Sequence, residues 1–383
     1  MNSPWERRCH RRAFLQGALS ALAFLSLPRP LWASAPPEMG YGYLEPHPAS
    51  FYRTLPGGLV QCQLCPRGCE VSEGDRGDCG VRQNRQGKYY SLVYGNPCAV
   101  HIDPIEKKPL FHCLPGSTSF SIATAGCNLH CKFCQNWEIS QARPEDTYNF
   151  KLPPDRVVAQ AREAGSPSVA YTYVEPFIFY EYLLDTARLA KKAGLLNVCH
   201  SAGYLNPQPL DALAEVLDAA CIDLKSFDRL FYANLVGGDL EPVLNTLKTL
   251  RRREVHLEIV NLVIPKFNDQ PETIAAMCKW LRDELGPLTP LHFSRFYPMH
   301  QMQNHYPTPV STLERARDTA LKAGLKYVYL GNIPAHPAEN TYCHGCGKLL
   351  IARRGYQVGE VHIKDGTCAF CGVKIPGIWK KKA

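Results

Sequence analysis

The chain has 383 residues, a formal net charge of +8 and 17 cysteines. Residues 1–35 hold five arginines against one glutamate, so +4 remains for the other 348 residues. That balance lacks the concentrated basic surface of a nucleic-acid-binding protein, and we expect no nucleic-acid partner. The length suits one large domain with small appendages.

The first 35 residues have the pattern of an export signal. Arg11 and Arg12 precede an apolar run over residues 13–27, and residues 33–35 (ASA) fit a small-residue cleavage site. The pattern predicts a twin-arginine signal and a periplasmic protein. The alternative is a non-functional signal and a cytoplasmic protein. The run is shorter than the about 20 residues of a membrane span, and no later segment qualifies, so we expect no stable span in the mature chain.

A first cysteine group lies in a predicted N-terminal module, residues 42–115. Cys62, Cys65, Cys69 and Cys79 have the spacing C-x2-C-x3-C-x9-C in a glycine-rich segment. Such a segment has little core of its own and needs a staple such as a metal. The spacing predicts four metal ligands, which would hold either a structural zinc ion or a second iron–sulfur cluster. Disulfides or free thiols are the remaining alternative.

A second group consists of Cys127, Cys131 and Cys134, with the spacing C-x3-C-x2-C and no fourth cysteine nearby. Three thiolates bind three irons of a [4Fe–4S] cluster and leave the fourth iron open. An open iron can bind a substrate, as an open zinc site does. The alternative is a set of zinc ligands or scattered buried thiols.

This spacing, with the aromatic Phe133 before the last cysteine, resembles the radical S-adenosylmethionine (SAM) superfamily. In that family the open iron chelates SAM, the reduced cluster donates one electron, and a 5′-deoxyadenosyl radical abstracts hydrogen from the substrate. The resemblance places Phe133 near the adenine of SAM; the alternative is a core aromatic. It also requires an electron donor as a partner.

Between the cysteine groups, apolar runs alternate with amphipathic stretches. The expected strands are 118–123, 168–173, 196–200, 220–224, 255–264, 291–297 and 326–330. The expected helices are 154–164, 178–193, 209–219, 243–253, 271–284 and 311–323. Repeated β/α units imply a parallel sheet with helices outside. We therefore predict an α/β fold, an incomplete (β/α)6 TIM-like barrel over residues 116–335, with small Cys-rich modules at both ends.

Polar residues follow several of these strands, where barrel enzymes place their functional groups. Glu175 stands about where the family has a carboxylate for the SAM amino group; the alternative is a helix N-terminal carboxylate. Ser201 is a candidate for the ribose or methionine end of SAM, or else part of a turn. Asp223 and Lys225 are two apart, so both face the barrel interior. Activases of glycyl-radical enzymes use a similar pair near the SAM carboxylate; the alternative is a self-satisfied ion pair.

The C-terminal residues 339–383 contain a third cysteine group. Cys343 and Cys346 form one C-x2-C knuckle, and Cys368 and Cys371 form a second one. The two knuckles are separated by 21 residues. Short strands are expected between the knuckles, at 349–351 and 356–358. The pattern predicts a zinc ribbon, with rubredoxin-like iron as the alternative.

Further motifs narrow the resemblance. The segments Asp103–Leu110 (DPIEKKPL) and Cys134–Trp137 (CQNW) are similar to activase-like radical SAM proteins. The segments Cys62–Cys69 (CQLCPRGC) and Glu339–Cys343 (ENTYC) are similar to the radical SAM component of the AmmeMemoRadiSam system, which implies AMMECR-type and Memo-type partners. We therefore predict a radical SAM enzyme that abstracts hydrogen from a protein or small molecule. The alternatives are a glycyl-radical-enzyme activase and a non-catalytic electron carrier or zinc-ribbon binding module.

Overall fold

The computed structural model describes residues 38–333 and 335–380, and the predicted export signal over residues 1–35 lies outside them. Within the described ranges we find no helical segment with both the length and the apolar character of a membrane span. Every cysteine in these ranges is a free thiol.

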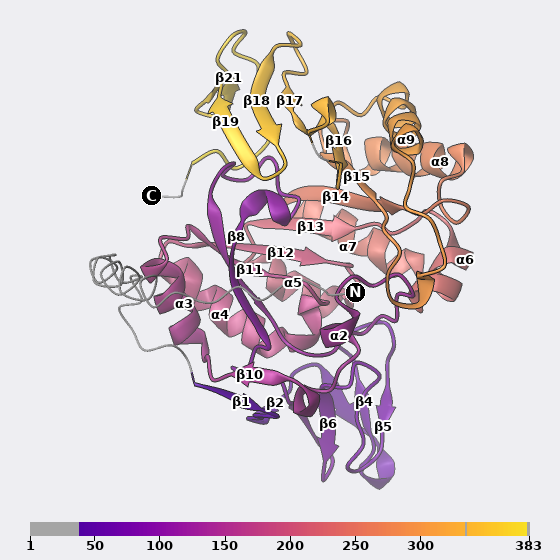
Figure 1. The fold of residues 1–383 in the computed structure, drawn as a ribbon. Coiled ribbons are helices and arrows are strands. Elements are labelled where there is room, and N and C mark those ends of the chain that lie inside the picture. Colours follow the sequence, from indigo (N-terminus) through magenta and orange to yellow (C-terminus); the bar gives the residue numbers. More distant parts are fainter. Residues whose placement is uncertain (1–37, 334, 381–383) are drawn as a thin grey trace, which may run out of the picture. The chain divides into compact units, whose positions relative to one another are not determined.

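An eight-stranded sheet forms the centre of the fold, in the order β16-β15-β14-β13-β12-β11-β9-β8 (Figure 1). Its seven strands from β9 to β16 are parallel, as the alternation of apolar and amphipathic segments predicts. The parallel strands are β9 (Thr118–Ala123), β11 (Ser168–Tyr171), β12 (Leu196–Ser201), β13 (Ala219–Asp223), β14 (His256–Val263), β15 (Leu291–Arg295) and β16 (Val328–Gly331).

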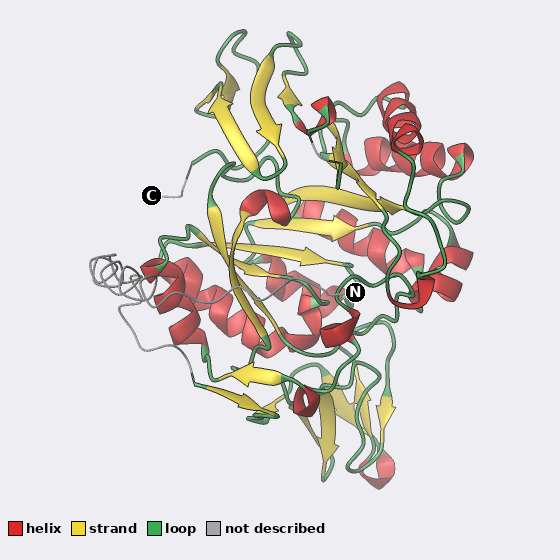
Figure 2. Ribbon diagram, viewed as in Figure 1, coloured by secondary structure: helices red, strands yellow, loops and turns green. Residues whose placement is uncertain are grey.

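Helices connect the parallel strands and cover the outside of the sheet (Figure 2). They are α3 (Pro154–Glu163), α4 (Tyr180–Lys192), α5 (Pro207–Ala214), α7 (Leu240–Arg252), α8 (Pro271–Trp280) and α9 (Val310–Lys322). In α7, Val243, Leu247 and Leu250 are fully buried, because residues four and seven apart share one helix face. Gly165 follows α3 with φ of 66°, the left-handed conformation that ends a helix.

One edge of the sheet differs from the prediction. β8 (Ala99–Pro104) lies within the predicted N-terminal module, yet it pairs antiparallel with β9 and extends the barrel sheet. The predicted helix 209–219 is also shorter, because the chain turns after α5 and enters β13 at Ala219. The α/β fold itself is as predicted.

Small sheets form the N-terminal part of the described chain. β3 (Tyr52–Thr54), β4 (Val60–Cys62) and β5 (Glu70–Val71) make one sheet, and β2 (His47–Pro48), β7 (Lys88–Ser91) and β6 (Arg82–Arg85) make another. β1 (Met39–Tyr41) pairs with β10 (Tyr148–Phe150). The first cysteine group begins at the end of β4.

The C-terminal residues form a three-stranded sheet of β17 (Thr341–Tyr342), β18 (Leu349–Arg354) and β19 (Gln357–Val361), followed by the hairpin of β20 (Ile363–Lys364) and β21 (Thr367–Cys368). A separate buried cluster joins this ribbon to the barrel, where Leu350 and Ile351 pack with Phe111, Tyr327 and Tyr329. The ribbon thus contacts both the edge strand β16 and the segment after β8.

Candidate active site

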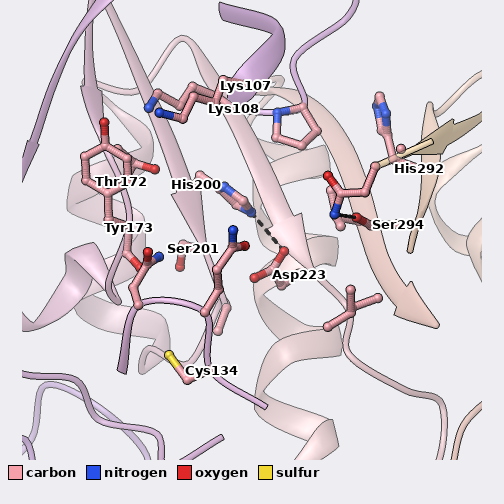
Figure 3. A pocket seen from close by; sticks show the side chains of 18 of the residues that line it. Lys107, Lys108, Cys134, Thr172, Tyr173, His200, Ser201, Asp223, His292 and Ser294 are labelled. Atoms are coloured by element: carbon pink, nitrogen blue, oxygen red, sulfur yellow. Dashed lines mark hydrogen bonds and ion pairs between the residues drawn. The ribbon is translucent and has the colours of Figure 1, made fainter. Parts of the chain in front are cut away.

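A cavity of about 1010 Å³ is enclosed by the large sheet. Both edge strands line it, through Ala99 and His101 of β8 and through Leu330 and Gly331 of β16. Groups at the carboxyl ends of the central strands line one end, and residues after β8 line the other (Figure 3). In barrel enzymes the carboxyl ends of the strands carry the chemistry, so this cavity is the candidate active site.

The cysteine triplet lies in the loop between β9 and the short helix α2 (Trp137–Ser140). Cys127, Cys131 and Cys134 all line the cavity. Two amides of this loop donate hydrogen bonds, each 2.9 Å long, to carbonyls of the segment Tyr232–Val236. The segment Tyr232–Val236 therefore holds the loop that presents the three thiols to one cavity.

The environment of these thiols is suited to a bound metal centre. Burial raises the pKa of Cys131 to about 11 and raises that of Cys127 further. Thiolates at this site therefore need the positive charge of a bound metal centre. Among the described residues, three or more ligand atoms lie within 4.8 Å of one another only in the C-terminal cysteine group.

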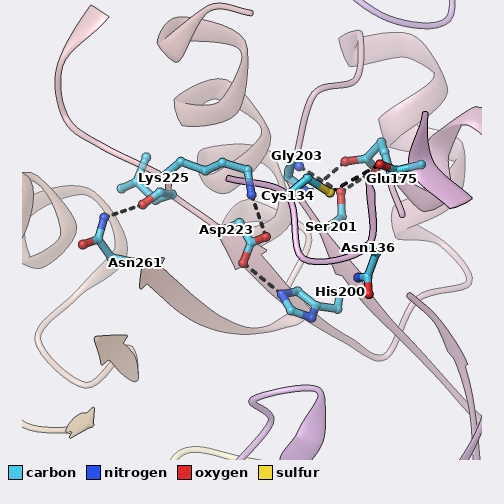
Figure 4. A network of polar contacts seen from close by, with 12 residues as sticks. Cys134, Asn136, Glu175, His200, Ser201, Gly203, Asp223, Lys225 and Asn261 are labelled. Atoms are coloured by element: carbon cyan, nitrogen blue, oxygen red, sulfur yellow. Dashed lines mark hydrogen bonds and ion pairs between the residues drawn. The ribbon is translucent and has the colours of Figure 1, made fainter. Parts of the chain in front are cut away.

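Glu175 lies beside the triplet and is 2 % exposed. Its carboxylate accepts hydrogen bonds from the Ser201 hydroxyl at 2.7 Å and from the Ala202 amide at 2.8 Å (Figure 4). It also accepts from the Phe177 amide at 3.2 Å, so it caps the short helix Pro176–Phe179. Burial raises the pKa of Glu175 to about 7. Glu175 is thus both a helix cap and a cavity residue, and Ser201 orients it.

Asp223 and Lys225 face the cavity together, as the alternation of a strand predicts. The Asp223 carboxylate lies 2.9 Å from Lys225 Nζ, and its other oxygen lies 2.9 Å from His200 Nε2. Burial opposes the charge of Asp223, but Lys225 and then His200 hold its pKa below the usual range. The cavity therefore presents a fixed carboxylate and a fixed ammonium.

Phe133 completes this end of the cavity. Its side chain is 6 % exposed, lines the cavity and packs against Phe231 with ring centroids 5.8 Å apart. Lys225 Nζ lies 5.9 Å from the centroid of the same ring. The ring contacts the core and faces the cavity, so it is available to pack against a flat ligand group.

The opposite end of the cavity carries two lysines that we did not predict as site residues. Asp103 accepts from Lys107 at 2.8 Å and from Lys108 at 2.5 Å, and the Tyr173 hydroxyl donates to the same carboxylate. Two cations therefore share one carboxylate, and the carboxylates Glu106 and Glu339 line the same cavity. The sequence contained the Asp103–Leu110 motif, but nothing in it indicated the contact with Tyr173, which lies 70 residues away.

Comparison with known proteins identifies the family. The model of the radical SAM superfamily matches residues 121–278. An uncharacterised protein of Methanocaldococcus jannaschii is 43 % identical over 329 residues, which cover 85 % of this chain and 98 % of that protein. The chain belongs to the radical SAM superfamily.

More distant relatives include the pyruvate formate-lyase-activating enzyme of Listeria monocytogenes. It is 24 % identical over 204 residues, which cover 49 % of this chain and 81 % of that enzyme. A solved domain of such an enzyme from Bacteroides vulgatus is 16 % identical with a TM-score of 0.39, and covers 43 % of this chain and 99 % of that one. The superfamily match and the activating-enzyme relatives show that this chain is a radical SAM enzyme. Membership implies an iron–sulfur cluster and SAM as cofactors.

The C-terminal cysteines of this radical SAM enzyme have the arrangement of a single-ion site. Cys343 Sγ lies 3.6 Å from Cys371 Sγ, and Cys346 Sγ lies 3.8 Å from Cys368 Sγ. The Gly345 amide donates to Cys343 Sγ over 3.4 Å. About 3.8 Å is the spacing of thiolates around one tetrahedral ion. The four predicted ribbon cysteines therefore form a group that could hold one metal ion.

The N-terminal cysteines are also brought together. Cys62 ends β4, and Cys65 and Cys69 lie in the turn between β4 and β5. Cys62 is close enough to influence the pKa of Cys65, Cys69 and Cys79 electrostatically. The four are nevertheless not drawn to the single-ion spacing seen in the ribbon.

Proposed function

We propose that Cys127, Cys131 and Cys134 hold a [4Fe–4S] cluster beside a bound SAM, and that the enzyme abstracts hydrogen from a protein or small-molecule substrate. One observation carries the proposal: the three thiols, Glu175 and the Asp223–Lys225 pair all line the same cavity. When bound, the cluster and SAM together supply a one-electron reductive cleavage that leads to hydrogen abstraction.

Each remaining residue at this end has a role toward SAM that its chemistry supports. Lys225 offers an ammonium for the SAM carboxylate, and Glu175 offers a carboxylate for the amino group. Ser201 fixes the direction of Glu175, and His200 and Lys225 fix that of Asp223. Phe133 provides a flat apolar surface for the adenine.

The cavity lies at the upper end of the size range of ligand pockets. Pockets for one drug-sized ligand have volumes of about 300–1,000 Å³, and this cavity measures about 1010 Å³. With SAM near the cysteine triplet, the substrate would occupy the end formed by Lys107 and Lys108. That end presents the ammonium groups of Lys107 and Lys108 together with the carboxylates of Glu106 and Glu339, so we expect a polar substrate that both donates and accepts hydrogen bonds there.

Three further assignments rest on sequence resemblance. The Cys62–Cys69 and Glu339–Cys343 motifs support membership of the AmmeMemoRadiSam system, with AMMECR-type and Memo-type partners. The knuckles of the ribbon support zinc as its metal. Arg11 and Arg12 support export by the twin-arginine route. Replacing both arginines by lysine should then remove the protein from the periplasmic fraction.

Anaerobic reconstitution followed by a SAM-cleavage assay tests the central proposal. Cys127→Ala, Cys131→Ala and Cys134→Ala should each abolish cleavage and the SAM-responsive cluster signal, because the loop offers no replacement thiolate. Cys98→Ala removes a thiol that does not line the cavity and should retain both. Cleavage that persists in any of the three triplet variants would reject the assignment.

A further inference from the structure

The N-terminal cysteine group lacks the compact geometry of the ribbon site. In the ribbon, opposite thiols lie 3.6 and 3.8 Å apart. Among the described residues, the ribbon cysteines form a group whose sulfur atoms all lie within 4.8 Å of one another, and Cys62, Cys65, Cys69 and Cys79 do not form such a group. Thiolates around one ion would be about 3.8 Å apart, whereas those around a cubane cluster lie farther apart on its corners. The wider group therefore fits a cluster.

Two buried donors without partners lie at the same site. Within the described part of the chain, the Arg82 Nε and the Tyr89 hydroxyl have no hydrogen-bond partner, and each side chain is 1 % exposed. Arg82 binds Glu181 through its two terminal nitrogens, at 3.0 and 2.9 Å, which leaves Nε free. Burial opposes its charge, while Glu181 and then Cys62 hold its pKa above the usual range. The guanidinium carbon of Arg82 lies 5.5 Å from the centroid of the Tyr89 ring.

The Tyr89 hydroxyl and Cys69 both lie beside Gly77. A Cβ placed on Gly77 would stand 2.8 Å from that hydroxyl and 3.8 Å from Cys69 Sγ. Buried donors are normally satisfied, so unpaired ones at one site indicate a missing acceptor. Sulfides and thiolates of an iron–sulfur cluster accept such hydrogen bonds, which also set the reduction potential.

This group touches the loop of the cysteine triplet. Gly126 immediately precedes Cys127, and a Cβ on Gly126 would stand 2.6 Å from the Cys79 carbonyl oxygen. Consecutive Cα atoms lie about 3.8 Å apart. Cys79 of the first group therefore lies next to Gly126, and Gly126 is bonded directly to Cys127 of the second group.

Polar contacts join the two loops at a second place. Arg67, between Cys65 and Cys69, donates to the Asn128 carbonyl over 2.5 Å. Arg67 also pairs with Asp78 at 2.7 Å, and Asp78 lies 2.8 Å from His130 Nε2. Asn128 and His130 belong to the triplet loop, so the two cysteine groups are held in one rigid arrangement.

We propose that Cys62, Cys65, Cys69 and Cys79 bind a second [4Fe–4S] cluster that relays single electrons to the first, a role that rests on the proposed function of the triplet. A one-electron donor protein of the ferredoxin class reduces the second cluster from the 2+ to the 1+ state. The second cluster returns to 2+ as it passes that electron to the triplet cluster. Four cysteine ligands close a cluster against substrate, which suits electron transfer alone.

Metal analysis of two variants tests the site. The Cys127→Ala, Cys131→Ala, Cys134→Ala triple variant leaves the N-terminal group intact, and we expect about four irons, four labile sulfides and the one ribbon metal. The Cys65→Ala, Cys69→Ala variant should also keep about four irons, with a SAM-responsive signal that shows a folded triplet site. Two zinc ions and no iron in the triple variant would overturn the second cluster and leave the proposed function standing.

Reduction kinetics test the relay. In the Cys65→Ala, Cys69→Ala variant, reduced ferredoxin should reduce the triplet cluster at least about tenfold more slowly than in wild type, while dithionite reduces both proteins alike. Tyr89→Phe, introduced into the triple variant, should leave the iron content unchanged. It should lower the reduction potential of the N-terminal cluster, because one hydrogen bond to sulfur is lost. Equal ferredoxin rates in variant and wild type would reject the relay, and an unchanged potential would reject the Tyr89 contact.

Discussion

Lys225→Met separates a SAM-binding role of the interior ion pair from a purely structural one. The change keeps the side-chain length and removes the ammonium from the cavity wall. Lys225 Nζ lies 2.9 Å from the Asp223 carboxylate, and the two side chains are 14 % and 25 % exposed. The variant therefore leaves Asp223 with His200 as its remaining partner, also at 2.9 Å.

The expected loss follows from this partial burial. Breaking a fully buried pair costs about 3–5 kcal/mol. His200 still binds Asp223 and a quarter of that side chain reaches solvent, so we expect about 2–3 kcal/mol here. If the ammonium binds the SAM carboxylate, this loss becomes a roughly 30- to 150-fold weaker SAM affinity, since about 1.4 kcal/mol is tenfold.

Titration of SAM into the reconstituted protein, followed by the electronic spectrum of the cluster, measures the affinity. Lys279→Met is the matched control, because its partner Asp283 lies 3.3 Å away in an exposed pair. Exposed pairs contribute little, so affinity and melting temperature should stay at wild-type values. A lower melting temperature for Lys225→Met with unchanged SAM affinity in the folded fraction would refute the SAM-binding role.

Three other changes probe the flanking structure. Cys346→Ser should remove about one equivalent of metal and lower stability, because metal binding at such a site is coupled to folding, while SAM cleavage at low temperature survives. Gly126→Ala should lower the free energy of unfolding by at least about 2 kcal/mol, because φ is +90° and the new Cβ would stand 2.6 Å from the Cys79 carbonyl oxygen. Gly74→Ala is the control: φ is +80° and the new Cβ meets open space, so this variant has the backbone strain without the clash. Glu258→Gln should lower the free energy of unfolding by about 2–4 kcal/mol. Despite burial, hydrogen bonds from His256 and His292 hold the Glu258 pKa below the usual range. Wild type should therefore lose this stability as pH falls below about 4.5, and the variant should show a flatter acid dependence.

Local patterns were enough to predict the barrel strands and their helices. Buried parallel strands appear as continuous apolar runs, and each helix carries its own amphipathic repeat. β8 was not predicted as a strand of this sheet because it lies at the edge and lacks a continuous apolar run; Ile102, for example, is 45 % exposed. The predicted helix 209–219 was too long because a contact distant in sequence ends it. The Asp218 carboxylate accepts a hydrogen bond from the Asn197 backbone amide at 2.8 Å, which directs the chain into β13.

Some residues of the candidate site could be found from the sequence, and others only from the structure. The cysteine triplet, Glu175 and the Asp223–Lys225 pair could be found because their spacing or their place at a strand end has chemical meaning. Ser201 was a candidate because it lies at a strand end. Its hydrogen bond to Glu175 joins residues 26 apart in sequence and could not be predicted. Lys107 and Lys108 acquire a role only through the curvature of the sheet, which brings the segment after β8 to the far end of the cavity.

The two Cys-rich modules contact the cavity region at different places, and this separates their roles. The N-terminal group packs on the triplet loop through Gly126 and Arg67, at the end of the cavity that holds the three thiols. The ribbon instead joins the two edge regions of the open sheet: Arg353 donates to the Phe111 carbonyl after β8, and Tyr327 and Tyr329 of the β16 region pack in its core. Loss of the ribbon metal should therefore loosen the barrel, whereas loss of the N-terminal centre should slow reduction without unfolding it.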